Sequence, residues 1–296
     1  MTDKTKNIYL LIISNTFFGF LPIVVKVANQ SHYSGVEESF FRFVFGAAGV
    51  LFLWVTGLQK MTFSNKKALF WRGFFGALSI VGYFTALQTT TSGKGTLLNY
   101  TYILWTNVFA IMFFKHKAPK RFFWFLLLAA VGIELVLDVQ WNSFNWGDAA
   151  GLFSGLTGGA AVLAMKECRK TDTALTVFSS FTIFSLVLSG ALLVGGDFWG
   201  SALGHASTWI MPDAQGLLIL LGIGAVSMIA QMLFTQAIGH ASLALSTLFT
   251  LSVPVLAALF GWIFLQEPLT SHFLAGMSLV LTACGAMIWQ ENQKTS

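Results

Sequence analysis

The sequence predicts an all-α membrane protein with ten transmembrane helices, arranged as two inverted five-helix repeats. Three observations predict this fold: long apolar runs recur along the chain, charged residues are scarce, and a weak repeat relates the two halves. Of the 296 residues, 55% are hydrophobic and 10% are charged, whereas soluble domains carry about 25% charged residues. So few charges cannot cover a water-exposed surface, and most of the chain is therefore expected to face lipid.

The apolar runs are typical of helices rather than strands. A spanning helix needs about 20 mostly apolar residues, whereas a membrane β-strand alternates apolar and polar residues. The runs Phe122–Val131 and Leu217–Leu221 show no alternation. The predicted spans are Ile8–Ala28, Glu38–Thr56, Phe70–Thr89, Gly95–Phe114, Phe122–Leu137, Gly147–Met165, Ala174–Val194, Gly216–Ala237, Leu243–Phe264 and Phe273–Gln290.

The charges separate onto two sides of a ten-span chain. Both termini and the loops near 60–67, 115–121 and 166–172 carry most Lys and Arg residues, whereas the opposite side collects carboxylates such as Glu37, Asp148 and Glu267. Because Lys and Arg favour cytoplasmic loops, both termini are predicted to be cytoplasmic in a bacterial inner membrane. One missed span would mix the two sets, so the separation also supports the count.

The repeat divides the chain into residues 1–140 and 141–296. Phe84-Thr85 lies 35 residues before Pro119, and Phe234-Thr235 lies 34 residues before Pro268. Five is an odd number of spans, so the second copy would be inserted in the opposite orientation. Inverted repeats are typical of secondary transporters, whose substrate site lies between the halves. The alternative is a chance likeness between hydrophobic segments.

Several motifs resemble the drug/metabolite transporter superfamily, in its EamA-like branch of ten-span carriers. They are Phe18-Gly19 followed by Lys26, Phe41-Arg42-Phe43, and His240–Glu267 followed by Leu269-Thr270. Asn99-Tyr100 and Trp105 are similar to the aromatic amino-acid exporters of that superfamily. The resemblance implies export or exchange of amino acids or related metabolites. The chain departs from the family pattern at Leu104-Trp105-Thr106, where Pro is common, and at Lys115-His116-Lys117, where an acidic residue is usual.

Polar residues within the spans are the candidates for substrate binding. In the fourth span Asn99, Tyr102 and Thr106 are spaced three and four apart, which places them on one helix face. The predicted substrate-binding residues are Tyr83, Asn99, Tyr102, Trp105, Thr106, Glu134, Gln231, Ser246 and Thr250. The alternative is that Ser and Thr only tie helices together, and that Tyr and Trp form interfacial belts.

Lys26, Glu38 and Arg42 are predicted to form a gate or an ion pair near the extracytoplasmic end. Charges at membrane depth are costly and usually face the bundle interior, and Glu38 and Arg42 are spaced for pairing on one helix face. The alternative for Lys26 is snorkelling to the interface. Glycines recur every fourth residue from Gly147 to Gly159, which favours close packing of another helix.

Other functional classes lack their motifs. There is no nucleophile elbow, zinc-protease motif or P-loop, so neither an enzyme nor a nucleotide-driven pump is expected. No cofactor and no metal are predicted, and the net charge of +5 is explained by topology rather than nucleic-acid binding. The expected partners are membrane lipid and a small-molecule substrate, with a monomeric protein. The alternative function is a non-transporting structural or partner-binding membrane subunit.

Overall fold

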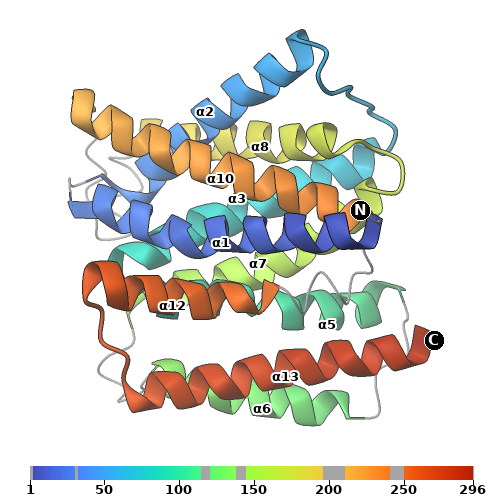
Figure 1. The fold of residues 1–296 in the computed structure, drawn as a ribbon, viewed down its shortest axis with the longest axis vertical. Coiled ribbons are helices and arrows are strands. Elements are labelled where there is room, and N and C mark those ends of the chain that lie inside the picture. Colours follow the sequence, from blue (N-terminus) through green and yellow to red (C-terminus); the bar gives the residue numbers. More distant parts are fainter. Residues whose placement is uncertain are drawn as a thin grey trace.

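A computed structural model describes residues 3–30, 33–114, 121–137, 145–195, 211–240 and 250–295. Within these ranges the chain forms eleven helices and no strand (Figure 1). The helices are α1 (Asp3–Gln30), α2 (Gly35–Val55), α3 (Lys66–Thr89), α4 (Ser92–Tyr100), α5 (Tyr102–Phe114), α6 (Phe122–Leu137), α7 (Trp146–Cys168), α8 (Ala174–Val194), α10 (Ala214–His240), α12 (Ser252–Leu265) and α13 (Ser271–Thr295). The all-helical prediction is therefore confirmed for the described residues.

Six of the described helices are long and apolar enough to cross a membrane. They are α1, α2, α3, α7, α8 and α10. Shorter apolar helices occur at Ser252–Leu265 and Ser271–Ala286. The prediction of several membrane-spanning helices is confirmed, and the total of ten stays a prediction.

Local sequence sets where five of the helices begin. Ser34, Asn65, Thr91, Asn145 and Thr173 each precede a helix, and the side chain of each accepts a backbone N–H from the first turn. A cap of this kind stabilises a helix by about 1 kcal/mol. The spans predicted at 122–137 and 174–194 coincide with α6 and α8.

The fourth predicted span is wrong as a single helix. The run Gly95–Phe114 is divided at Thr101 into α4 and α5. The Thr101 hydroxyl donates to the Leu98 carbonyl at 2.7 Å, and Thr side chains bonded to nearby carbonyls compete with regular helix geometry. The ninth predicted span begins in residues that lie outside the described ranges, and α12 starts at Ser252.

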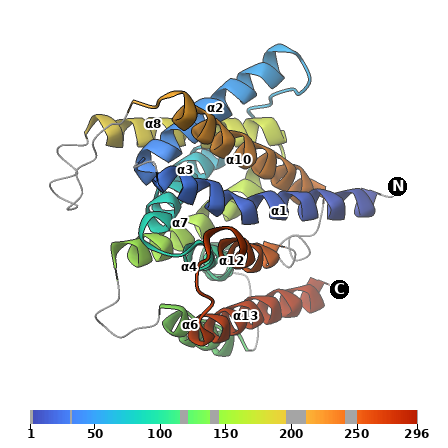
Figure 2. The same cartoon turned by 60° about the vertical axis from the view of Figure 1, so that its left-hand side comes forward.

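The helices of the two halves pack mainly against each other. Helix α3 packs against α7 and α8, just as α10 packs against α1 and α2. Helix α7 also contacts α4 and α5, as α1 contacts α12. The pairs α2–α8, α4–α12 and α6–α13 each join corresponding elements of the halves (Figures 1 and 2). This exchange of partners is the pattern that a two-fold relation between the halves produces.

Both chain ends lie at the same end of the bundle in both views (Figures 1 and 2). An even number of spans requires both termini to lie on the same side of the membrane.

The glycine stripe of α7 allows backbones to approach closely. A Cβ placed on Gly151 would lie 2.9 Å from the Leu98 Cβ, and one on Gly155 would lie 2.7 Å from the Leu98 carbonyl oxygen. A Cβ on Gly159 would lie 2.6 Å from the Trp105 Cβ. The predicted packing role of the stripe is confirmed, because α4 and α5 occupy the space that side chains there would need.

Candidate substrate cavity

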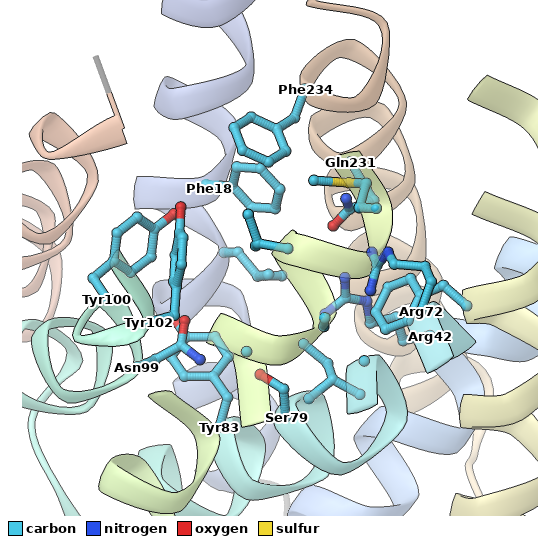
Figure 3. A pocket seen from close by; sticks show the side chains of 18 residues that line it. Phe18, Arg42, Arg72, Ser79, Tyr83, Asn99, Tyr100, Tyr102, Gln231 and Phe234 are labelled. Atoms are coloured by element: carbon cyan, nitrogen blue, oxygen red, sulfur yellow. The ribbon is translucent and has the colours of Figure 1, made fainter. Parts of the chain in front are cut away.

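A cavity of about 110 Å³ lies in the middle of the bundle. Its walls come from α1, α2, α3, α4, α5, α7, α8 and α10, and thus from both halves of the chain (Figure 3). One water molecule needs about 10–15 Å³ by the same measure. The cavity therefore has room for several waters or for part of a small solute.

Three tyrosines form one wall of the cavity (Figure 3). The hydroxyl oxygens of Tyr83 and Thr96 are 2.9 Å apart, and Tyr102 is hydrogen-bonded to Thr250. The rings of Tyr100 and Tyr102 are tilted against each other, with centroids 5.3 Å apart. The bonds to Thr96 and Thr250 hold two of the three rings in place, so the wall is both aromatic and polar.

Two carboxamides also line the cavity. Asn99 on α4 donates from Nδ2 to the Ser154 hydroxyl of α7 at 2.5 Å. Gln231 on α10 is buried, and its Nε2 lies 3.4 Å from the Thr235 hydroxyl one turn later. Since each amide donates to a neighbour, its orientation within the cavity is fixed.

Arg42 and Arg72 line the side of the cavity that faces the tyrosines (Figure 3). Their exposed fractions are 3% and 6%. The Cζ atoms of Arg42 and Arg72 lie 5.9 and 4.3 Å from the centroid of the Phe181 ring, so the two guanidinium groups share one aromatic surface. A Cβ on Gly76 would collide with the Arg72 guanidinium and with the Phe181 ring. The absence of a side chain at Gly76 therefore lets Arg72 lie against its own helix.

Phe18 of α1 and Phe234 of α10 close the cavity on another side (Figure 3). Their rings meet edge to face with centroids 6.0 Å apart. Pro22 lies inside α1 four residues after Phe18 and has no N–H to donate to the Phe18 carbonyl. The cavity is thus bordered by a helix turn that lacks one of its regular hydrogen bonds.

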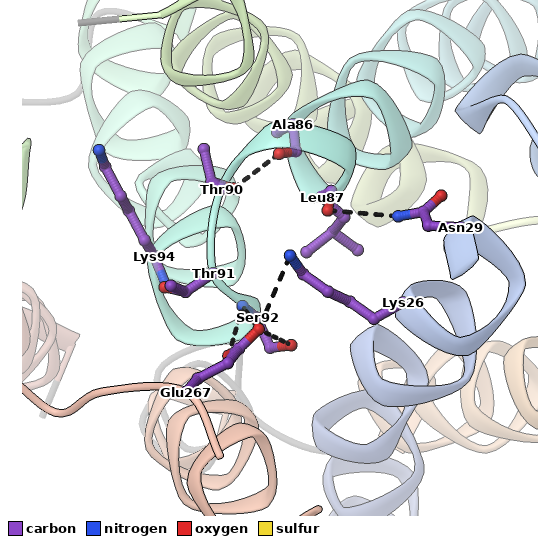
Figure 4. A network of polar contacts seen from close by, with 9 residues as sticks. All are labelled: Lys26, Asn29, Ala86, Leu87, Thr90, Thr91, Ser92, Lys94 and Glu267. Carbon is purple, nitrogen blue, oxygen red and sulfur yellow. Dashed lines mark hydrogen bonds and ion pairs between the residues drawn. The ribbon is translucent and has the colours of Figure 1, made fainter. Parts of the chain in front are cut away.

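A polar network joins the halves at one end of the bundle (Figure 4). Glu267 follows α12, and its carboxylate accepts the Ser92 backbone N–H at 2.8 and 3.0 Å and the Ser92 hydroxyl at 3.1 Å. Lys26 of α1 lies 3.7 Å from the same carboxylate. Nearby, Lys94 pairs with the buried Asp148 at 2.8 Å. We call this part of the molecule the Glu267 end.

The predicted ion pair between Glu38 and Arg42 is wrong. Among the described residues no ion pair involves either side chain, and neither Glu38 carboxylate oxygen has a hydrogen-bond partner. The Arg42 guanidinium lies instead over the rings of Phe43 and Phe84, with Cζ 5.1 and 5.5 Å from their centroids. Helical spacing allows the pair, but aromatic neighbours turn the arginine toward the cavity.

The structure brings five of the predicted residues together around the cavity. They are Arg42, Tyr83, Asn99, Tyr102 and Gln231. These residues come from five helices, so their convergence depends on the tertiary structure.

Other predicted residues lie elsewhere. Trp105 contacts Phe109 and is not among the cavity residues. Thr106 donates to the carbonyls of Tyr102 and Gly159 at 2.7 and 3.3 Å, and thereby ties α5 to α7. The Glu134 side chain is exposed on α6. Ser246 lies outside the described residues.

Sequence reasoning missed several cavity residues: Phe18, Arg72, Tyr100, Phe181 and Phe234. The predicted third span, Phe70–Thr89, places Arg72 in its first turn, beside the basic loop near residues 60–67. The helix begins at Lys66, after the cap residue Asn65. An Asn before a helical run is a start signal, and it would have placed Arg72 in the second turn of the helix rather than beside the loop. Within the residues described, no three His, Cys, Asp or Glu side chains form a metal-binding group.

Comparisons with known proteins identify the class of molecule. A solved crystal structure superimposes with a TM-score of 0.64 at 14% identity, covering 99% of both chains, which shows a shared fold. The pseudopaline exporter CntI of Pseudomonas aeruginosa is 25% identical over 283 residues, 95% of each chain. An uncharacterized transporter of Archaeoglobus fulgidus is 22% identical over 283 residues, again 95% of each chain.

The chain matches the EamA-like transporter family twice, over residues 5–137 and 145–289. It therefore belongs to this family of membrane transporters, and each match covers most of one half. The resemblance to drug/metabolite transporters that the sequence motifs indicated is thus confirmed.

Proposed function

We propose that the protein is a secondary transporter that exports or exchanges small polar metabolites, amino acids or their relatives, across the bacterial inner membrane. The observation that carries the proposal is the cavity between the two halves, which is lined by helices of both and holds polar side chains from each. Substrate sites of secondary transporters lie at such repeat interfaces. The substrate would contact Arg42, Tyr83, Asn99, Tyr102 and Gln231.

The proposed mechanism is alternating access, in which the two halves rock about the cavity. At the Glu267 end, Glu267 of the second half holds Ser92 of the first half. At the opposite end, the buried Asp172 accepts the backbone N–H groups of Ser64 and Asn65 at 2.6 and 3.1 Å. The cavity can open to one side only when the bonds on that side break, so these two sets of bonds are the proposed gates.

The charge distribution supports one orientation in the membrane. Basic residues are concentrated in the sequence at the chain termini and in the loops near 60–67, 115–121 and 166–172, whereas Glu267 and Asp148 mark the opposite end. We infer that both termini are cytoplasmic and that the Glu267 end faces outward. A phosphatase or a fluorescent protein fused after Ser296 tests this, because phosphatase activity requires export and fluorescence requires a cytoplasmic location. An active phosphatase fusion would overturn the assignment.

The transport function is tested by flux through purified protein in liposomes. Proteoliposomes loaded with radiolabelled amino acids should show saturable release that empty liposomes lack. Gln231→Leu removes a polar cavity group and should lower the flux. Gln236→Leu is the matched control, because Gln236 lies on the same helix and does not line the cavity. A folded protein that moves no amino acid, nucleotide sugar or drug would favour the alternative of a structural membrane subunit.

A further inference from the structure

The two buried arginines of the cavity have no anionic partner among the described residues. Among the described residues, neither Arg42 nor Arg72 forms an ion pair. Arg42 Nη1 and Arg72 Nε are buried without a hydrogen bond. Both side chains line the cavity, and both reach it beside the same Phe181 ring. Two unneutralised cations therefore face one small space.

The free energy gained from the aromatic contacts does not offset the cost of burying these two charges. A cation over an aromatic ring gains about 0.5–2 kcal/mol, whereas removing an ion from water costs several kcal/mol in real proteins. The two like charges also repel each other. An anion in the cavity would offset this cost, because a guanidinium forms short, paired hydrogen bonds with carboxylate and phosphate groups.

The rest of the lining narrows the chemistry of the solute. None of the described residues that line the cavity is Asp or Glu, so the site offers no negative charge to an ammonium group. Its other polar groups are the amides of Asn99 and Gln231 and the hydroxyls of Ser79 and the tyrosines. The tyrosines and Phe18 present aromatic surface on which an apolar or ring-containing part of the solute can lie.

We infer that the transported metabolite carries at least two negative charges, as two carboxylates or one phosphate group, held between Arg42 and Arg72 with its body against the tyrosine wall. This inference rests on the proposed transport function and specifies its substrate class. An amino acid with one carboxylate and one ammonium would leave one arginine unneutralised. An acidic amino acid or an amino-acid conjugate with additional acid groups satisfies both arginines.

The test identifies the exported solute without choosing it beforehand. Proteoliposomes are loaded with a small-molecule extract of bacterial cells, and the released compounds are identified by mass spectrometry against protein-free liposomes. Matched pairs that differ by one acidic group, glutamate with glutamine and phosphoserine with serine, are then compared as competitors. The two pairs distinguish a dicarboxylate from a phosphate ester.

Substitutions distinguish a specific loss of the arginine site from a general loss of folding or transport. Arg72→Gln should raise the half-saturating concentration at least about tenfold, the loss expected for a charge-assisted hydrogen bond. It should also remove the preference for the acidic member of each pair. Lys67→Gln removes one exposed positive charge from the same helix and should change neither value. Gly76→Ala keeps the charge but displaces the Arg72 guanidinium, and should weaken the same preference if Arg72→Gln does not fold.

The possible outcomes are distinct. Release of compounds with two acid groups or a phosphate, lost in Arg72→Gln and kept in Lys67→Gln, supports the inference. Release of neutral or cationic compounds, or an unchanged preference in folded Arg72→Gln, overturns the inference and leaves the transport function standing. No specific release of any compound from liposomes with folded protein overturns the transport function itself.

Discussion

Neutralising Glu267 should shift the protein toward opening at the Glu267 end. In the structure this carboxylate accepts two donors of Ser92 and lies near Lys26. Glu267→Gln keeps the size of the side chain but removes its charge. A hydrogen bond to a charged group contributes about 1.5–3 kcal/mol, whereas a neutral one contributes about 0.5–1.5 kcal/mol. Each Ser92 bond therefore weakens by about 1 kcal/mol.

The Lys26 contact adds less to this total. The two side chains are 21% and 13% exposed and 3.7 Å apart, and a partly exposed pair contributes about 0–1 kcal/mol. The whole change is about 2–3 kcal/mol, provided the bonds exist only in the closed state. At about 1.4 kcal/mol per factor of ten, the ratio of open to closed protein at this end should rise about 30- to 140-fold.

Accessibility of a single cysteine measures this ratio. Ala161 lines the cavity, so Ala161→Cys, in a background where Cys168 and Cys284 are Ala, reports entry of a charged maleimide from each side of oriented vesicles. Glu267→Gln should speed labelling from the Glu267 side and slow it from the other. Glu167→Gln removes a carboxylate from the exposed pair with Lys170 and serves as the control. Unchanged labelling in folded Glu267→Gln would refute the gating role of Glu267.

Three further predictions follow from the contacts. Asp172→Ala removes two hydrogen bonds to backbone N–H groups at the opposite end. It should slow labelling of Ala161→Cys from the Glu267 side and speed labelling from the other side. Faster labelling from the Glu267 side would contradict the two-gate mechanism. Gly35→Ala places a Cβ 2.7 Å from the Phe84 backbone, which should lower the free energy of unfolding by about 1–3 kcal/mol and lower the thermal midpoint in detergent. Gly222→Ala places a Cβ 3.7 Å from the nearest atom, in Val24, and should leave the midpoint unchanged. Equal midpoints for the two variants would contradict the close packing at Gly35. Cys168 and Cys284 are buried free thiols, so a hydrophilic maleimide should label both only after denaturation, and rapid labelling of the folded protein would contradict their burial.

Much of the helical structure could be predicted from the sequence because it depends on local information. Apolar run length reflects the thickness of the lipid core, and cap residues satisfy backbone groups within one turn. The spans at α6 and α8 were therefore predicted to the residue. The family motifs were equally readable, since they are short and contiguous.

The break at Thr101 shows where local reasoning failed. The run Gly95–Phe114 looks continuous because hydropathy does not register a single residue that separates two helices. The prediction put Asn99, Tyr102 and Thr106 on one face by assuming one helix. After the break, Asn99 and Tyr102 line the cavity, whereas Thr106 bonds to the Gly159 carbonyl of α7.

The position of a residue along a membrane span does not fix the direction in which its side chain points. Glu134 was predicted to bind substrate from the fifth span, but its side chain is exposed on α6 and is not among the residues that line the cavity. Arg72 lies in the first turn of the predicted third span, beside a basic loop, yet its side chain is 6% exposed and lines the cavity. The helix period gives the angle between two side chains around the helix axis. It does not show which side of the helix faces the neighbouring helices.

The sequence alone determined that this chain is a helical membrane protein of a transporter family, because solvent preference and family motifs are properties of neighbouring residues. The tertiary structure decided that Arg42 and Arg72 meet at one ring, that Glu267 reaches Ser92, and that the Glu38 carboxylate bonds to none of the described residues. Those contacts join residues that lie far apart in the chain or depend on surrounding helices. They arise from the rotation and packing of whole helices, which no local pattern specifies.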